Sequence, residues 1–199
     1  MDKKLQKLNS NDYKVIASLH SDNINQGFLA SLGVPFLTLL YEVIDKDSKS
    51  VLLVERVDHS VVGFVTGTCG LGRIYKQLLL KPLRLIYALK SCLLSPSKIY
   101  KIIELLLISK DRNISSDFSK QELLSIVVTP AYQGRGHAEN LFNSLCSHFR
   151  KEGASCFNIV VGSNLDRAHA FYMKMGSVPI KETQVHKGVH SIVYVKNLS

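Results

Sequence analysis

The segment at residues 120–176 constrains the fold more than any other, because it alternates strand and helix with little loop between them. β-rich runs at 123–129 and 156–161 are each followed by a helical pattern, at 136–151 and 164–175. A strand, a helix and a second strand in this order favour a parallel strand pair joined by a right-handed crossover. The core of the fold is therefore predicted to contain such a unit.

Antiparallel strands are predicted on both sides of this segment. The further β-rich runs are residues 5–8, 51–57, 61–68, 178–184 and 191–195. Asp58-His59-Ser60 separates two of these runs and is a hairpin signal. Helical patterns cover residues 12–19, with Asp12 as the expected cap, then Asn23 or Asn25 to Leu32, then 35–43. We expect an α/β (α+β) fold with a central mixed, mostly antiparallel, twisted sheet and helices on both faces.

A helical insertion at about residues 71–118 is predicted between the third and fourth strands. Residues 71–94 and 97–108 have apolar side chains at helical spacing, and Pro96 separates the two. The chain contains no internal repeat and no low-complexity linker. Residues 1–199 are therefore predicted to form a single domain that carries this insertion.

The net charge of +9 is concentrated in the insertion. Residues 71–110 carry one acid, Glu104, and the following basic residues: Arg73, Lys76, Lys81, Arg84, Lys90, Lys98, Lys101 and Lys110. Such a concentration attracts anions, from cofactor phosphates to nucleic acid or anionic lipid. Leu-rich faces between the cations suit a weak contact with an anionic membrane, although leucines that cover the core would give the same pattern. Single-stranded nucleic acid is disfavoured, because only Tyr75, Tyr87 and Tyr100 are interleaved.

Several other classes of protein are disfavoured by the sequence. No stretch reaches about 18 uninterrupted apolar residues, so a membrane span is not expected. The N-terminal residues are polar and lack the apolar region of an export signal. Four scattered cysteines without C-x-x-C spacing are then expected to be reduced thiols of a cytoplasmic protein. The seven histidines show no metal-ligand spacing, so no metal is expected.

The turn between the strand at 123–129 and the following helix has the composition of an anion site. It reads Val127-Val128-Thr129-Pro130-Ala131-Tyr132-Gln133-Gly134-Arg135-Gly136-His137-Ala138. Gly134 and Gly136 can adopt backbone angles closed to other residues and allow a ligand close to the main chain. The first N–H groups of the helix lack intrahelical partners and favour a pyrophosphate. A tight connection that binds nothing would use the same glycines.

A second set of residues recurs in order further along the chain. It comprises Asn164, Ala168, Phe171-Tyr172 and Gly176. Asn164 can cap the helix that carries Tyr172 about two turns later. Taken singly, Asn164 is an ordinary cap and Tyr172 an ordinary core aromatic. Their joint occurrence after the glycine turn is the informative feature.

Together, residues 120–176 resemble the GCN5-related N-acetyltransferase (GNAT) superfamily. Gln133, Gly136 and Ala138 match its pyrophosphate motif Gln/Arg-x-x-Gly-x-Gly/Ala, and the Asn…Ala…Phe-Tyr…Gly pattern matches the second set. Ser177 departs from the family, in which an aromatic residue often follows the glycine. The resemblance implies a GNAT-like fold and acetyl-CoA, or another acyl-CoA, as the donor, with no metal. The residues expected to bind it are Val127, Val128, Gln133, Gly134, Arg135, Gly136, His137, Ala138 and Asn164.

The resemblance also implies two catalytic residues. Tyr172 would protonate the departing thiolate, and Glu122 would act as the base for the amine, directly or through water. Glu55 on the earlier hairpin is a second candidate for the base. The implied reaction is direct attack by a primary amine of a small molecule within a ternary complex. A segment Gly33-Val34-Pro35-Phe36-Leu37…Tyr41 resembles bacterial members thought to act on amino sugars, and the basic insertion would suit a nucleotide-linked amino sugar. Other small-molecule amines and peptides stay open as acceptors.

Two alternatives remain open at this stage. A catalytically silent CoA-binding module would keep the glycine turn without needing Glu122 or Tyr172, and an acyltransferase for a protein or peptide amine would keep all of these residues. The chain is expected to act as a monomer or a homodimer, with the acceptor amine rather than nucleic acid as its partner.

Overall fold

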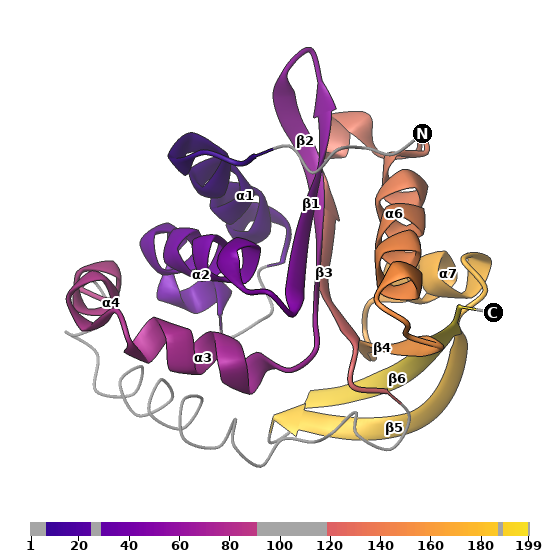
Figure 1. The fold of residues 1–199 in the computed structure, drawn as a ribbon. Coiled ribbons are helices and arrows are strands. Elements are labelled where there is room, and N and C mark those ends of the chain that lie inside the picture. Colours follow the sequence, from indigo (N-terminus) through magenta and orange to yellow (C-terminus); the bar gives the residue numbers. More distant parts are fainter. Residues whose placement is uncertain (1–6, 25–28, 91–118, 187–188, 199) are drawn as a thin grey trace.

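The computed structural model describes residues 7–24, 29–90, 119–186 and 189–198. Its six strands are β1 (Ser50–Val57), β2 (Ser60–Thr68), β3 (Glu122–Val128), β4 (Cys156–Gly162), β5 (Val178–His186) and β6 (Val189–Asn197). They form one sheet in the order β1-β2-β3-β4-β6-β5 (Figure 1). β3 and β4 are parallel, whereas the other neighbouring strands are antiparallel. The predicted mixed, mostly antiparallel sheet is confirmed.

Helices cover both faces of the sheet, as expected. The described helices are α1 (Ser10–Asn23), α2 (Val34–Lys46), α3 (Leu71–Leu79), α4 (Pro82–Ala88), α6 (His137–Lys151) and α7 (Asp166–Lys174), with short 3-10 turns η1 (Ala30–Leu32) and η2 (Pro130–Tyr132). α1 and α2 pack on one face, and α6 packs on the other (Figure 1). The apolar core is accordingly divided into two clusters, one on the α1–α2 face and one on the α6–α7 face.

The β1–β2 hairpin is built as its sequence predicts. Asp58 and His59 both have positive φ, at 48° and 66°. A two-residue turn with two positive φ values is type I′, which matches the twist of the strands it joins.

The N-terminal predictions need three corrections. Asn9, not Asp12, is the cap of α1: its side chain accepts from the Asp12 N–H, and the Asp12 carboxylate accepts from the Asn9 N–H in a capping box. The helix expected to end at Leu32 is only the 3-10 turn η1 in the described part, and residues 25–28 lie outside it. For the strand predicted at 5–8, residues 7 and 8 are not in a strand, and residues 5 and 6 lie outside the described residues.

The insertion follows β2 and precedes β3, the second and third described strands. Residues 71–94 were expected to be one helix, but α3 and α4 are separate because Pro82 cannot continue the first. The helix predicted at 97–108 lies outside the described residues. Within the described ranges no helix is long and apolar enough to cross a membrane.

β3 and β4 are paired at one end only. Their register comprises Glu122 with Asn158 and Leu123 with Ile159. A bulge follows, since Thr66 of β2 pairs with Ser125 and Gly67 pairs with Leu123, which leaves Leu124 without a partner. Beyond this bulge the two central strands diverge (Figure 1). The sheet therefore contains a gap between β3 and β4 that opens toward the carboxyl end of β3.

Candidate active site

The glycine turn lies at the open end of this gap, between β3 and α6. Gly134 and Gly136 have φ of 72° and 84°, the left-handed region that favours glycine. A Cβ at either position would have no heavy atom within 4 Å, so the backbone angle and not crowding requires glycine here. Gly136 is the cap of α6 and has no side chain; the Glu139 carboxylate bonds its own N–H, which leaves those of His137 and Ala138 without a bond from the cap. These N–H groups are therefore available to an anion.

Two side-chain contacts hold the turn in place. Gln133 Nε2 donates a 2.9 Å hydrogen bond to the carbonyl oxygen of Val128. His137 Nδ1 lies 3.3 Å from Oε1 of Glu55, which is buried on β1. Glu55, the second candidate for the base, thus contacts the turn.

The surroundings of the turn suit a negative ligand. Arg135 is exposed and lies over the ring of Tyr132, with its guanidinium carbon 5.6 Å from the ring centroid. Glu139, the acid in the first turn of α6, is paired with Lys174 of α7 at 2.9 Å. Ala138 packs against the core cluster on the α6–α7 face. An anion at the turn would therefore meet a nearby guanidinium and an acid that is already paired.

The register of β3 decides which of its main-chain groups face the gap. Thr129 N–H donates to Val62 O, and in an antiparallel pair alternate residues bond across the ladder. The N–H and C=O of Val127 therefore point toward β2, whereas those of Ile126 and Val128 point into the gap. The Val128 carbonyl is the one that Gln133 bonds, in agreement with this orientation. Of the two residues predicted to bond the donor through their main chain, Val128 therefore points into the gap and Val127 does not, whereas Ile126 does; binding itself stays a prediction.

Glu122 lies at the closed end of the gap, where β3 and β4 are still paired. It is about 20 Å from the end of β3 at about 3.3 Å per residue. Leu123 belongs to the cluster on the α6–α7 face, so alternation places Glu122 on the α1–α2 face. Burial raises the pKa of the Glu122 carboxyl to about 7. No hydrogen bond or ion pair joins this carboxyl to another residue in the described part of the chain.

Tyr172 lies on the opposite face, on α7. It is buried, and its ring packs against Phe142, Phe171 and Tyr194. Burial raises the pKa of Tyr172, so the phenol stays protonated and can act as a proton donor. Among the described residues, none is hydrogen-bonded to the Tyr172 hydroxyl. The two catalytic candidates therefore lie on opposite sides of the sheet.

The ends of α7 differ in part from the prediction. Leu165 is the cap of the helix, and Asn164 precedes it without making a capping bond. Asn164 is exposed after the end of β4, across the gap from β3. At the other end Gly176 has φ of 72°, and Ser177 N–H donates to the carbonyl of Tyr172. The Asn164 side chain is therefore not used by the helix start.

A buried polar chain next to the bulge was missed at the sequence level. The Tyr41 hydroxyl of α2 lies 2.5 Å from Nδ1 of His20 on α1, and it is also hydrogen-bonded to the Ser125 side chain on β3. Burial lowers the pKa of His20 to about 4, so its ring is neutral, and the tautomer decides which of the two groups donates. His20 continues the buried helical stripe formed by Tyr13, Ile16 and Ala17, and that spacing was the available signal. These hydrogen bonds link α1 and α2 to β3, the strand that carries Glu122.

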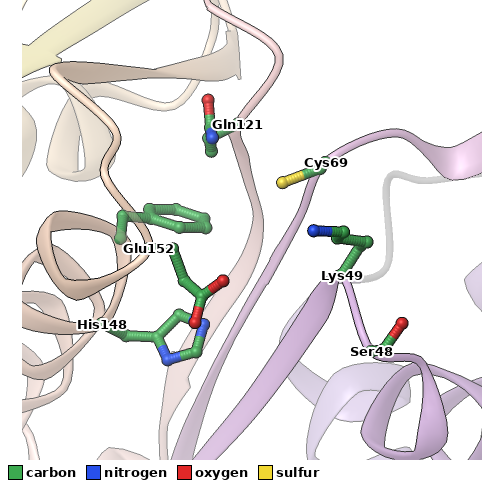
Figure 2. A pocket seen from close by; sticks show the side chains of 7 residues that line it. Ser48, Lys49, Cys69, Gln121, His148 and Glu152 are labelled. Carbon is green, nitrogen blue, oxygen red and sulfur yellow. The ribbon is translucent and has the colours of Figure 1, made fainter.

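A small cavity lies away from the gap. It is lined by Ser48, Lys49, Cys69, Gln121, His148, Phe149 and Glu152, whose side chains are shown in Figure 2. These residues come from the start of β1, the ends of β2 and α6, and the residue before β3. Burial raises the pKa of the Cys69 thiol, which disfavours a thiolate nucleophile. Nowhere in the described ranges do three or more His, Cys, Asp or Glu residues gather as metal ligands would.

One family model and several solved structures match this chain. A model of the acetyltransferase (GNAT) family matches residues 21–177. No curated protein matches the chain. An N-acetyltransferase from Staphylococcus aureus Mu50 has a similar structure, with a TM-score of 0.63 at 12% identity over 96% of each chain.

Two further solved structures illustrate the range of similar proteins. The PaiA N-acetyltransferase from Thermoplasma acidophilum, in complex with coenzyme A, gives a TM-score of 0.60 at 12% identity over 96% of each chain. The ribosomal-protein-S18-alanine N-acetyltransferase from Escherichia coli gives 0.55 at 12% identity, over 98% of this chain and 92% of that one. At such identities these similarities show the fold, whereas the family match carries the assignment.

Proposed function

The chain belongs to the acetyltransferase (GNAT) family, and from that premise we propose that it transfers the acetyl group of acetyl-CoA to a primary amine of a small molecule. One observation carries the proposal: the gap between β3 and β4 runs from the glycine turn to a half-buried carboxyl, Glu122, whose pKa is raised to about 7. A bound acetyl-CoA supplies the acetyl group as a thioester. The chain supplies the anion site, main-chain donors, a base and an acid.

The turn and the gap would hold the donor. The free N–H groups at the start of α6, with Gly134 and Gly136, fit the pyrophosphate, and Arg135 adds charge beside it. The N–H groups of Ile126 and Val128 would then bond the pantetheine arm along β3. Asn164 would bond it from the other side of the gap.

Glu122 would accept the proton of the attacking amine. An alkylammonium group has a pKa of about 10.4, so a base is needed at neutral pH. A carboxyl with a pKa near the working pH combines a deprotonated population with useful basicity. Its place on the α1–α2 face means that the acceptor would enter from this face, beside Ser125.

Tyr172 would return a proton to the sulfur as the carbon–sulfur bond breaks. The amine nitrogen forms its bond to the acetyl carbon while the two bound reactants are held together, and no covalent enzyme intermediate is needed. Glu122 on one face of the sheet would thus take the proton from the amine, and Tyr172 on the other face would give a proton to the thiolate. The half-buried thiol of Cys69 and the buried thiol of Cys146 then need no role in the reaction.

We propose an amino sugar, free or nucleotide-linked, as the acceptor. The segment at residues 33–41, on which the resemblance to amino-sugar enzymes rests, lies mainly in α2, and its Phe36, Leu37 and Tyr41 are buried. Phe36 and Leu37 therefore contribute to the core, and Tyr41 acts through its contact with Ser125. The proposal consequently rests on an acceptor site that α1, α2 and β3 would form on the α1–α2 face of the sheet.

An acceptor panel tests this function. The protein is incubated with acetyl-CoA and one amine at a time, namely hexosamines, nucleotide-linked amino sugars, polyamines and peptides with a free N-terminus, and free thiol is measured. We expect thiol release with an amino sugar, and a product that carries one acetyl group. Release with peptides alone would replace the acceptor by a protein amine. Binding of acetyl-CoA without release for any amine would favour a silent CoA-binding module.

A further inference from the structure

The two helices of the insertion expose an apolar surface. We call it the α3–α4 face, and it comprises Leu79, Leu80, Leu83, Ile86 and Tyr87, each at least half exposed. Leu80 and Leu83 are 81% and 82% exposed. The helices already bury another side, with Ile74, Leu78 and Leu85 in the core cluster beside α2. The leucines of the α3–α4 face therefore do not cover the core, which was the simpler explanation for the sequence pattern.

The charge around this face is of one sign. Residues 71–90 contain five basic residues and no acidic residue. Arg73 donates a 3.0 Å hydrogen bond to Asp47, and Arg84 donates one of the same length to Glu42 of α2. Lys76 and Lys81 form no ion pair with another described residue, and Lys90 lies over the Tyr87 ring at 4.7 Å. Cations beside exposed apolar side chains make the α3–α4 face complementary to a partner that has a negatively charged outer layer and an apolar interior.

We propose that the α3–α4 face binds an anionic lipid surface. Leucine, isoleucine and tyrosine side chains would enter the boundary between headgroups and acyl chains, and the flanking lysines would contact the lipid phosphates. A second copy of the chain is a poor occupant, because a two-fold contact would place the same lysines against each other. In this proposal α3 and α4 would lie along the lipid surface; no described helix is long and apolar enough to cross a membrane.

The position of this face leaves the donor side free. α4 lies beyond α2, on the side of the sheet opposite to α6 and the glycine turn (Figure 1). The protein can therefore bind lipid while acetyl-CoA enters from solution. Loss of lipid binding should leave the KM for acetyl-CoA unchanged, so this proposal and the proposed function can fail independently.

Vesicle flotation tests the proposal with the full chain. Vesicles of phosphatidylcholine, alone or mixed with phosphatidylglycerol, are used with wild type and two variants, Leu80→Ser/Leu83→Ser and Lys76→Glu/Lys81→Glu. A third variant, Met173→Ser/Val178→Ser, changes two apolar residues elsewhere that are 54% and 56% exposed and serves as the control. We expect wild type and control to float with the anionic vesicles. Each α3–α4 variant should bind the anionic vesicles at least about tenfold more weakly, because the first loses apolar contact area and the second loses positive charge.

Three results would overturn the proposal. Wild type could fail to float with anionic vesicles, it could float equally with neutral ones, or the two α3–α4 variants could bind as wild type does. Size-exclusion elution and thermal unfolding of Leu80→Ser/Leu83→Ser identify the occupant in the first case. A changed elution volume indicates a second copy, and a lowered melting temperature alone indicates cover by residues 91–118 of the chain itself.

Discussion

The side-chain amide of Gln133 donates to the main-chain carbonyl of Val128 at 2.9 Å, and this bond joins the anion-binding turn to the strand that borders the gap. Val128 is the last residue of β3, and its carbonyl faces the gap. The bond therefore fixes where the turn lies relative to the N–H groups that would hold the pantetheine arm. Preorganisation of this kind reduces the ordering cost of binding.

Gln133→Ala should weaken acetyl-CoA binding while leaving the fold intact. Gln133 is exposed, and one hydrogen bond of this kind contributes about 0.5–1.5 kcal/mol. We expect the dissociation constant, measured by calorimetry, to rise roughly 2–10-fold. Asn143→Ala, at an exposed position of α6, is the control. Equal affinities for Gln133→Ala and wild type would show that the bond does not position the turn.

Gly136→Ala and Gly153→Ala form a matched pair at the two ends of α6. Both glycines have positive φ, 84° and 79°, and an added Cβ has open space at both. Each substitution should lower stability by about 1–2 kcal/mol through backbone strain. Only Gly136→Ala should also weaken acetyl-CoA binding, because it alone moves the N–H groups of the anion site. Weakened binding in both variants would mean that the effect is one of general stability.

Glu122→Gln should remove the base and its pH dependence. With a carboxyl pKa of about 7, wild-type kcat/KM should fall tenfold per pH unit below pH 7, as the base becomes protonated. The glutamine variant should lose roughly 10²–10⁴-fold in rate and show no such limb. The limb should remain near pH 7 for amines of different pKa. A limb that moves with the amine would assign it to the acceptor instead.

The same variant should be more stable than wild type at pH 8. The pKa of Glu122 is raised by burial, so its stabilising contribution is complete below its unfolded value and is lost as pH rises through 7. An uncharged glutamine avoids this loss, and we expect a gain on the order of 2 kcal/mol at pH 8 after screening at its exposed edge. Thermal unfolding at pH 4 and pH 8 measures it. Glu182→Gln, at an exposed site, should show no gain, and a destabilised Glu122→Gln would contradict this account.

Tyr172→Phe should lower kcat and leave stability unchanged. Its hydroxyl bonds none of the described residues, whereas the ring packing is kept by phenylalanine. We expect kcat to fall by about 10² or more, with little change in the KM for acetyl-CoA. Tyr194→Phe loses the 2.8 Å bond to His169 and should instead cost about 1 kcal/mol of stability. Undiminished turnover in Tyr172→Phe would remove the role assigned to that hydroxyl.

Patterns that depend on local physics were predicted well from the sequence. The alternation at 120–176 predicted β3, α6, β4 and α7, because apolar period and glycine punctuation act over a few residues. The hairpin turn at Asp58-His59 and the positive φ values of Gly134 and Gly136 are of the same kind. The family resemblance rested on these residues, and the family match confirms it.

Features that depend on pairing across the sheet were not predictable in the same way. The bulge at Leu124 rotates the strand, and it determines that Ile126 rather than Val127 faces the gap. The contact between Glu55 and His137 joins residues 82 positions apart. The break before Pro82 was visible in the sequence but was outweighed by the continuous leucine pattern. The roles of Glu122, Tyr172 and the turn residues stay predictions until the variants are measured.

Thermal unfolding with and without acetyl-CoA tests the central claim most directly. Ligand at 100 times its dissociation constant stabilises the folded state by about 2.7 kcal/mol, which for a domain of this size raises the melting temperature by roughly 5–10 °C. We predict this rise for wild type and a smaller one for Gly136→Ala at the same concentration. No rise with acetyl-CoA or with longer acyl-CoAs would contradict the account, since the gap and the turn would then not hold the donor.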